Sequence, residues 1–206
     1  MRTGEAPVRF DAVILAGGRS SRLGGVPKAG LVLEGVTLLE RTCAALADAG
    51  QMVVVGPEAR TGGGRAMPGA PSFVREEPAF TGPAAALVAG FRTGAGSRAP
   101  WCAVVACDMP RVAELVDVLL AEAAASDDDA SLVAFDGGRS QPLAALYRSD
   151  DMAAAVAAVL AAGTADNLSM RSLLASVRTR PVPVAPGTTH DVDTWADARV
   201  LGVDVP

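Results

Sequence analysis

Three uninterrupted apolar runs separate helical stretches in the first half of the chain. The runs are rich in valine and alanine and show no polar alternation, which is typical of strands buried on both faces. In the first helical stretch, Thr37 is placed to cap the helix and Gly50 to end it. We expect strands over 11–17, 52–56 and 101–108, and helices over 37–50, 82–94 and after Pro110. This alternation predicts a largely parallel sheet with helices on both faces.

The second half of the chain departs from this alternation. Residues 131–148 are two strand-like runs joined by the turn signal DGGRS, so a hairpin should place at least one antiparallel strand in the sheet. An alanine-rich helix over 151–162, the segment LSMRSLLASV, a strand over 177–184 and a final helix from about Asp193 follow. The glycine- and proline-rich residues 57–71 predict a surface loop. We expect one domain over 11–206 after a flexible N-terminus over 1–10.

Composition and charge exclude several classes of protein. The chain has 18 basic and 23 acidic side chains and a formal net charge of -5, which argues against nucleic-acid binding and attraction to anionic lipid. The longest apolar run, 152–162, is too short to span a bilayer, and MRTGEAPVRFD lacks the apolar stretch of a secretory signal. Cys43, Cys102 and Cys107 have no metal-ligand spacing, so we expect reduced, buried thiols in a cytoplasmic protein.

The segment GGRSSRLGGVPK, residues 17–28, has the chemistry of an anion-binding loop. Ligands of open α/β sheets bind beyond the carboxyl ends of the strands, where this segment begins. Gly17 and Gly18 let a ligand approach the backbone, and successive N–H groups form a nest for phosphate. Arg19, Arg22 and Lys28 add full positive charges. The alternative is a solvated turn whose glycines serve only the backbone.

Spacing excludes two common phosphate loops. The glycines come in adjacent pairs, unlike G-x-G-x-x-G, and Lys28 lies between proline and alanine, unlike the GK[ST] of a P-loop. The pattern G-G-x-S-x-R-x-G-x-x-x-K instead resembles the signature of nucleotidyltransferases. LAGGRSSRLGGVPK is similar to the form in molybdenum cofactor guanylyltransferases, which attach GMP to molybdopterin. Further similar segments are REEPAFTGPAAAL (75–87), CDMP (107–110) and SQPLAALY (140–147).

The resemblance covers nearly the whole chain and implies both a fold and a set of site residues. The fold would be a three-layer α/β sandwich around a mixed, mostly parallel Rossmann-like sheet. The residues from Leu15 to Gly18 would lie against guanine and ribose, Lys28 would contact phosphate, and Asp108 would hold Mg²⁺. The substrate-binding candidates are Leu15, Ala16, Gly17, Gly18, Arg19, Lys28, Glu77 and Asp108. The catalytic candidates are Arg22, Lys28 and Asp108.

Carboxylates near two segment ends are candidate metal ligands. Asp108 ends the third strand, and Mg²⁺ prefers one or two carboxylates with phosphate oxygens and waters. Its alternative role is to cap the next helix. Asp191 and Asp193 point the same way in an extended segment, at a place where the family more often has N-x-N-T-P. Asp191 is the second candidate ligand for the metal, and Asp193 is equally a ligand or a helix cap.

Three other positions carry weaker signals. Glu77 falls where the family commonly has a nucleotide-contacting aspartate, so it could accept hydrogen bonds from guanine or ribose. Gly56 stands where the family often has asparagine, so that contact is lost or passes to the backbone. His190 has no ligand spacing, which favours a surface position.

These residues include no obvious general base, and the reaction that the resemblance implies does not need one. A phosphate monoester is mostly ionised near neutral pH, because its second pKa is about 6. We therefore expect Mg²⁺-dependent transfer of GMP from GTP to the phosphate of molybdopterin, with release of pyrophosphate. Transient contacts with the maturation proteins of molybdoenzymes are also expected.

Three alternatives stay open at this point. Related nucleotidyltransferases use CTP or act on sugar phosphates or phospholactate. The sequence DVD at 191–193 is a D-x-D motif of glycosyltransferases, in which it normally lies mid-chain. A nucleotide-binding carrier without turnover is the third alternative.

Overall fold

The computed structural model describes residues 7–58, 67–96, 98–163, 165 and 167–204. The expected N-terminal segment 1–10 and surface loop 57–71 therefore lie partly outside the described residues. Phe10 is the first residue of the first strand and is buried, so the sheet begins one residue before the expected domain boundary.

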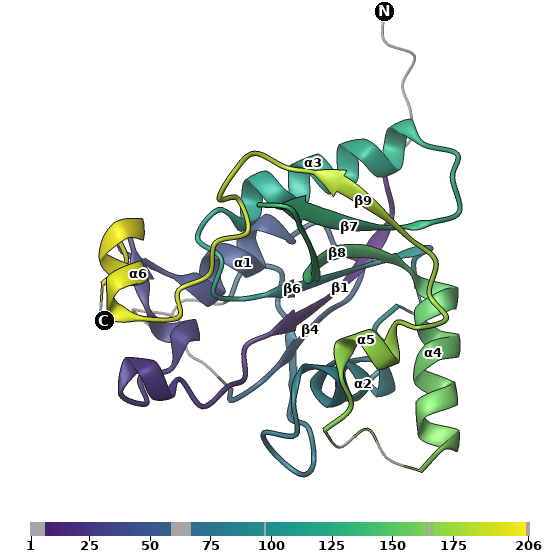
Figure 1. Cartoon of the computed structure of the whole chain (residues 1–206), viewed down its shortest axis with the longest axis horizontal. Helices are drawn as coiled ribbons and strands as arrows, with labels where there is room; N and C mark the ends of the chain where they lie inside the picture. The colour runs from purple at the N-terminus through teal and green to yellow at the C-terminus, as the bar shows by residue number, and fades with distance from the viewer. Residues whose placement is uncertain (1–6, 59–66, 97, 164, 166, 205–206) are drawn as a thin grey trace, which may run out of the picture.

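A seven-stranded sheet forms the centre of the protein (Figure 1). Its strands are β1 (Phe10–Leu15), β4 (Met52–Val55), β5 (Ser72–Val74), β6 (Trp101–Ala106), β7 (Ser131–Asp136), β8 (Arg139–Arg148) and β9 (Thr179–Pro183). The order is β5-β4-β1-β6-β8-β7-β9, and β8 alone runs against the other strands of this sheet. The mostly parallel sheet and the late hairpin, which turns at Gly137 and Gly138, are confirmed.

Helices cover both faces of the sheet, which gives the expected three layers (Figure 1). The α-helices are α1 (Leu38–Ala45), α2 (Pro83–Arg92), α3 (Val112–Ala125), α4 (Ser149–Ala161), α5 (Met170–Leu173) and α6 (Trp195–Leu201). Helices α1 and α3 lie on one face, and α2, α4 and α5 lie on the other. Two short 3-10 helices, η1 (Ser21–Leu23) and η2 (Lys28–Gly30), and the small β2 (Val32–Leu33) and β3 (Val36–Thr37) pair follow β1. Within the part of the chain described, every helix is too short or too polar to serve as a transbilayer segment.

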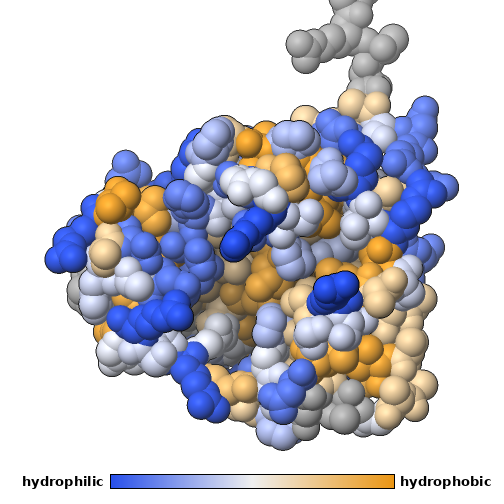
Figure 2. Space-filling model, in the orientation of Figure 1, coloured by the Kyte–Doolittle hydropathy of each residue, from blue (hydrophilic) through white to orange (hydrophobic). Residues whose placement is uncertain are grey.

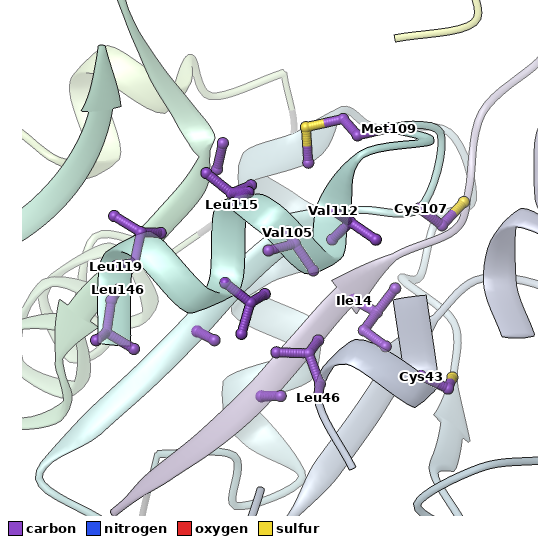
Figure 3. Close-up of a cluster of buried hydrophobic side chains, with 14 of the residues drawn as sticks. Ile14, Cys43, Leu46, Val105, Cys107, Met109, Val112, Leu115, Leu119 and Leu146 are labelled. Carbon is purple, nitrogen blue, oxygen red and sulfur yellow. The ribbon is translucent and has the colours of Figure 1, made fainter. Parts of the chain in front are cut away.

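Successive residues of β1 point to opposite faces and so belong to two separate cores. Ile14 packs in one core with Leu46, directly after α1, and with Leu115 of α3 (Figure 3). Val13 packs on the other side with α2 and α4. Burial on both faces explains why β1 is apolar without alternation.

The sequence predicted the start of α1 correctly but not its end. Thr37 forms a capping box with Glu40, as a cap at that position predicts. The helix ends at Ala45, earlier than Gly50 suggested. The Gly50 amide instead donates to the Phe10 carbonyl over 2.8 Å, so this glycine already aligns the chain beside β1.

A third, smaller core attaches the end of the chain to the loop after β1. It contains Leu23, Leu31, Leu38, Val192, Ala198 and Val203. Backbone bonds between Val32 and Asp204 add to this contact. Because this core joins η1 and α6, the segment just before α6 lies beside the glycine-rich loop.

Gly56, directly after β4, has no room for a side chain. A Cβ atom there would lie 2.8 Å from the Ala16 carbonyl carbon and 3.0 Å from the Gly17 nitrogen, which are backbone atoms at the end of β1. We expect Gly56→Ala to lower the free energy of unfolding by about 1–3 kcal/mol, measured by urea denaturation. At Gly30, a Cβ atom would meet nothing within 4 Å, so Gly30→Ala is the matched control and should stay near wild type. Equal stability of both variants would contradict this packing.

Candidate active site

Two segments with charged residues leave the sheet at the same edge. Strands β1 and β6 are parallel neighbours whose last residues, Leu15 and Ala106, are register partners. The Cys107 amide donates to the Leu15 carbonyl over 3.0 Å, and the Ala16 amide donates to the Val55 carbonyl over 2.8 Å. The glycine-rich loop and Asp108 therefore begin side by side, at the carboxyl edge where ligands of α/β sheets bind.

The glycine-rich loop presents its backbone outward and is anchored by one apolar side chain. Gly17 and Gly18 are exposed, and Leu23 is buried in the third core. Leu15 and Ala16 are buried, and the Leu15 carbonyl and the Ala16 amide already bond to the neighbouring chain segments. Figure 2 shows this face of the molecule hollowed between the part that carries α6 and the part that carries α5, with hydrophobic side chains on the floor.

Lys28 lies between two carboxylates from distant parts of the chain. Its Nζ donates to Asp108 Oδ2 over 2.7 Å and to Asp193 Oδ1 over 2.5 Å. The lysine side chain is 21% exposed. Burial lowers the pKa of Lys28, but the charge of Asp108 and the hydrogen bonds to both carboxylates outweigh it and raise the pKa to about 12. Lys28 is the only lysine in the sequence, so the ammonium group at this site is unique.

Arg22 extends this ion-pair network toward solvent. Its Nη1 lies 3.3 Å from Asp193 Oδ2, and its side chain is 72% exposed. The guanidinium is thus free to turn toward a ligand at little cost, because an exposed ion pair contributes weakly to stability. Arg19 lies elsewhere in the loop, 5.6 Å from the centre of the Phe80 ring.

Asp108, Asp191 and Asp193 form a cluster that we call the carboxylate cluster. One oxygen of each lies within 4.8 Å of the others. Burial and the charges of the other two aspartates raise the pKa of Asp191. Asp108 Oδ1 is buried and has no hydrogen-bond partner among the described residues. Hard oxygen ligands, crowded negative charge and an unsatisfied buried oxygen fit a divalent cation such as Mg²⁺.

The structure decides against helix-capping roles for two of these aspartates. The N-cap of α3 is Arg111, and Asp108 pairs with Lys28 instead. Thr194 caps α6 in a capping box with Asp197, which leaves the Asp193 side chain to contact Lys28 and Arg22.

The acidic segment before α2 places two glutamates differently. Glu76 Oε1 accepts the Phe80 amide over 3.0 Å and lies 3.9 Å from the position of a Cβ atom on Gly17. Glu77 is exposed and, like Glu76, lines a cleft of about 480 Å³ beside α2 and the end of α4. Of the two, Glu76 is the glutamate nearer to the glycine-rich loop, and no spacing in the sequence distinguishes it from Glu77.

The sequence-predicted residues therefore fall into two groups. The structure brings together Arg22, Lys28, Asp108 and Asp191, beside the end of β1 and the adjoining loop, which hold Leu15, Ala16, Gly17, Gly18 and Arg19. Glu77 lines the cleft beside α2, and its predicted contact with the nucleotide stays a prediction. His190 is exposed, as expected. The contact of Asp193 with Lys28 was not foreseen, because it depends on how α6 docks.

The three cysteines are buried and unpaired, which confirms the expectation of free thiols. Burial, with a smaller contribution from Glu40, raises the pKa of Cys43 to about 12, and burial likewise raises the pKa of Cys102 and Cys107. Protonated thiols of this kind pack as small apolar groups.

Comparisons with known proteins identify the family of this chain. The family model of the MobA-like NTP transferase domain matches residues 12–181. A molybdenum cofactor guanylyltransferase of Bordetella petrii is 33% identical over 144 residues, which cover 68% of this chain and 71% of that protein. A protein of Mycobacterium ulcerans named "Probable molybdenum cofactor guanylyltransferase" is 34% identical over 200 residues, with coverage of 87% and 96%.

The fold agrees with a solved structure as well. Molybdopterin-guanine dinucleotide biosynthesis protein A of Archaeoglobus fulgidus superposes with a TM-score of 0.61 at 19% identity, covering 93% of this chain and 96% of that one. The family match over residues 12–181 and the similarity to these relatives show that the chain belongs to the MobA-like NTP transferase family and is a nucleotidyltransferase.

Proposed function

We propose that this enzyme transfers GMP from GTP to the phosphate of molybdopterin, releasing pyrophosphate and forming a guanine dinucleotide. The observation that carries the proposal is the 2.7 Å contact between Lys28, in the nucleotidyltransferase signature, and Asp108, at the end of β6. The names of the relatives from Bordetella and Mycobacterium support the choice of guanine nucleotide and acceptor.

In this proposal, the nucleotide binds along the loop that follows β1. The exposed backbone of Gly17 and Gly18 allows close approach of guanine and ribose, and Glu76 lies near enough to offer a carboxylate acceptor. The triphosphate would then extend along the loop toward Lys28, with Arg22 able to bind its oxygens. An anion there would be stabilised by both fixed positive charge and backbone N–H groups.

The chemistry proposed here is mainly electrostatic. The terminal phosphate of the acceptor is already mostly ionised near neutral pH, so its oxygen can attack the α-phosphorus of GTP without a general base. The bond to the β-phosphate breaks as the new bond forms, and pyrophosphate leaves. Lys28 and Arg22 would reduce the repulsion between the two anions and stabilise the charge that develops on the leaving group.

The carboxylate cluster would hold Mg²⁺ through Asp108, Asp191 and Asp193. When bound, this ion supplies charge neutralisation at phosphate oxygens. Without it, three carboxylates face the two cations Lys28 and Arg22, which leaves an excess of negative charge beside the site of an anionic substrate.

We further propose that residues 11–206 act as one nucleotidyltransferase domain, because the third core attaches the last helix to the glycine-rich loop. The buried, unpaired cysteines are compatible with the reducing cytoplasm, where we place the enzyme. The product would pass from there to the maturation proteins of molybdoenzymes.

Substitutions at the ion pair test the site. We expect Lys28→Ala and Asp108→Asn each to lower kcat/KM for pyrophosphate release by about a hundredfold or more. Lys28→Ala removes a positive charge aimed at the reacting phosphates, and Asp108→Asn removes a carboxylate that would hold Mg²⁺ and orient Lys28. Arg22→Ala should lower it less, since this side chain is mostly exposed. Arg199→Ala, on the exposed side of α6, is the matched control for loss of a cation. Near-normal turnover of the Lys28 or Asp108 variant, with thermal unfolding unchanged, would refute the assignment.

The choice of nucleotide has a separate test. Pyrophosphate release should be measured with each of the four NTPs, with molybdopterin and with phosphorylated sugars as acceptors. We expect the rate of pyrophosphate release with GTP and molybdopterin to exceed the rate with every other pair by at least about tenfold, because a site that hydrogen-bonds the base discriminates against other bases. Faster reaction with CTP or a sugar phosphate would assign the other branch of nucleotidyltransferases. GTP binding without any pyrophosphate release would favour a carrier without turnover.

A further inference from the structure

The segment 185–193 carries two members of the carboxylate cluster but contains no helix or strand. It connects β9 to α6 and lies beside the ends of β6 and β7. A segment of this kind lacks a regular ladder of hydrogen bonds, so other contacts must fix its position. The contacts that do so determine where Asp191 and Asp193 are placed.

A buried carboxylate on β7 supplies the largest group of these contacts. Asp136 is the last residue of β7 and is 7% exposed. Its Oδ1 accepts the Gly187 amide over 3.1 Å, and its Oδ2 accepts the Thr189 amide over 3.0 Å and the Thr189 hydroxyl over 2.9 Å. One carboxylate therefore binds three donors within three residues of the segment, two residues before Asp191.

The electrostatics of Asp136 are consistent with a fixed, ionised carboxylate. The hydrogen bond from the Thr189 amide lowers the pKa of Asp136 below its usual value, although burial opposes this effect. Hydrogen bonds to an ionised acceptor are stronger than neutral ones. Neither Gly187 nor Thr189 can move away without leaving a buried charge with fewer donors.

Two single contacts hold the ends of the segment. Arg111 Nη1 donates to the Pro186 carbonyl over 3.1 Å, while its other nitrogens bind Glu114. The Val192 amide donates to the Asp108 carbonyl over 3.0 Å. This second bond joins the segment directly to the residue that pairs with Lys28.

We propose that Asp136 is a positioning residue whose carboxylate fixes the turn at 187–189 and thereby holds Asp191 and Asp193 beside Asp108 and Lys28. The structural part of this proposal, that Asp136 fixes the turn, does not depend on what the protein catalyses. The kinetic part, that the turn affects catalysis, rests on the proposed function, because it assumes that the carboxylate cluster serves nucleotidyl transfer.

A graded series of variants tests the proposal. Asp136→Ala removes all three acceptor contacts, Asp136→Asn keeps one acceptor oxygen, and Thr189→Val removes only the hydroxyl donor. Asp117→Asn, on the exposed side of α3, is the matched control for loss of a carboxylate. Thr189→Val also serves if the Asp136 variants fold poorly, because it leaves the buried carboxylate with both backbone donors.

The first measurement is amide hydrogen exchange in protein without metal or nucleotide. We expect exchange within 185–193 to become at least about tenfold faster in Asp136→Ala, less so in Asp136→Asn and least in Thr189→Val. Amides of β1 and β6 should keep the wild-type rate. Thr189→Val should add little further effect in an Asp136→Ala background, because the hydroxyl has already lost its acceptor. Unchanged exchange in 185–193 of Asp136→Ala would overturn the proposal whatever the enzyme's activity.

The second measurement is the Mg²⁺ concentration that gives half-maximal pyrophosphate release. It should rise by about tenfold in Asp136→Asn while GTP affinity measured without Mg²⁺ stays within about twofold of wild type. A uniform loss of GTP affinity, with the Mg²⁺ requirement unchanged, would overturn the positioning role and leave the proposed function intact. If the wild-type protein releases no pyrophosphate with any NTP, the proposed function fails, and hydrogen exchange alone decides the structural part.

Discussion

The ammonium group of Lys28 holds together two carboxylates that the chain order keeps far apart. Asp108 follows β6, and Asp193 precedes the last helix, 165 positions after the lysine. Each ion pair reduces the repulsion that the three clustered aspartates would otherwise exert on one another. The rest of the site depends on this neutralisation, because a triphosphate cannot approach an uncompensated group of carboxylates.

The fold positions these charged groups in two different ways. The parallel pairing of β1 and β6 brings the glycine-rich loop and Asp108 to one edge of the sheet through hydrogen bonds that any parallel sheet would form. The placement of Asp191 and Asp193 depends on more contacts, because α6 must pack on η1 through the third core and Asp136 must fix the segment 185–193. The charged half of the site is therefore more sensitive to distant packing than the loop that faces the nucleotide.

The sequence predicts features that depend on neighbouring residues better than features that depend on distant packing. Strand β1 and the cap at Thr37 depend on neighbouring residues, and both were foreseen. Asp108 could be named as a candidate because a carboxylate at the end of an apolar strand is informative without any tertiary contact. The Lys28–Asp193 pair was not, because nothing in local composition encodes the docking of α6. The choice between Glu76 and Glu77 depends on the direction of one side chain in an irregular segment, which periodicity does not specify.

We propose that the Lys28 ammonium lies where the phosphates of GTP bind. Because the chain has one lysine, a sample labelled with ¹⁵N-lysine gives a single side-chain ammonium signal in NMR. This signal should shift when GTP and Mg²⁺ are added without acceptor, and the same addition should leave the signal unmoved in a variant that does not bind nucleotide. An unchanged signal in wild-type protein that equilibrium dialysis has found saturated with GTP would show that the phosphates bind away from Lys28.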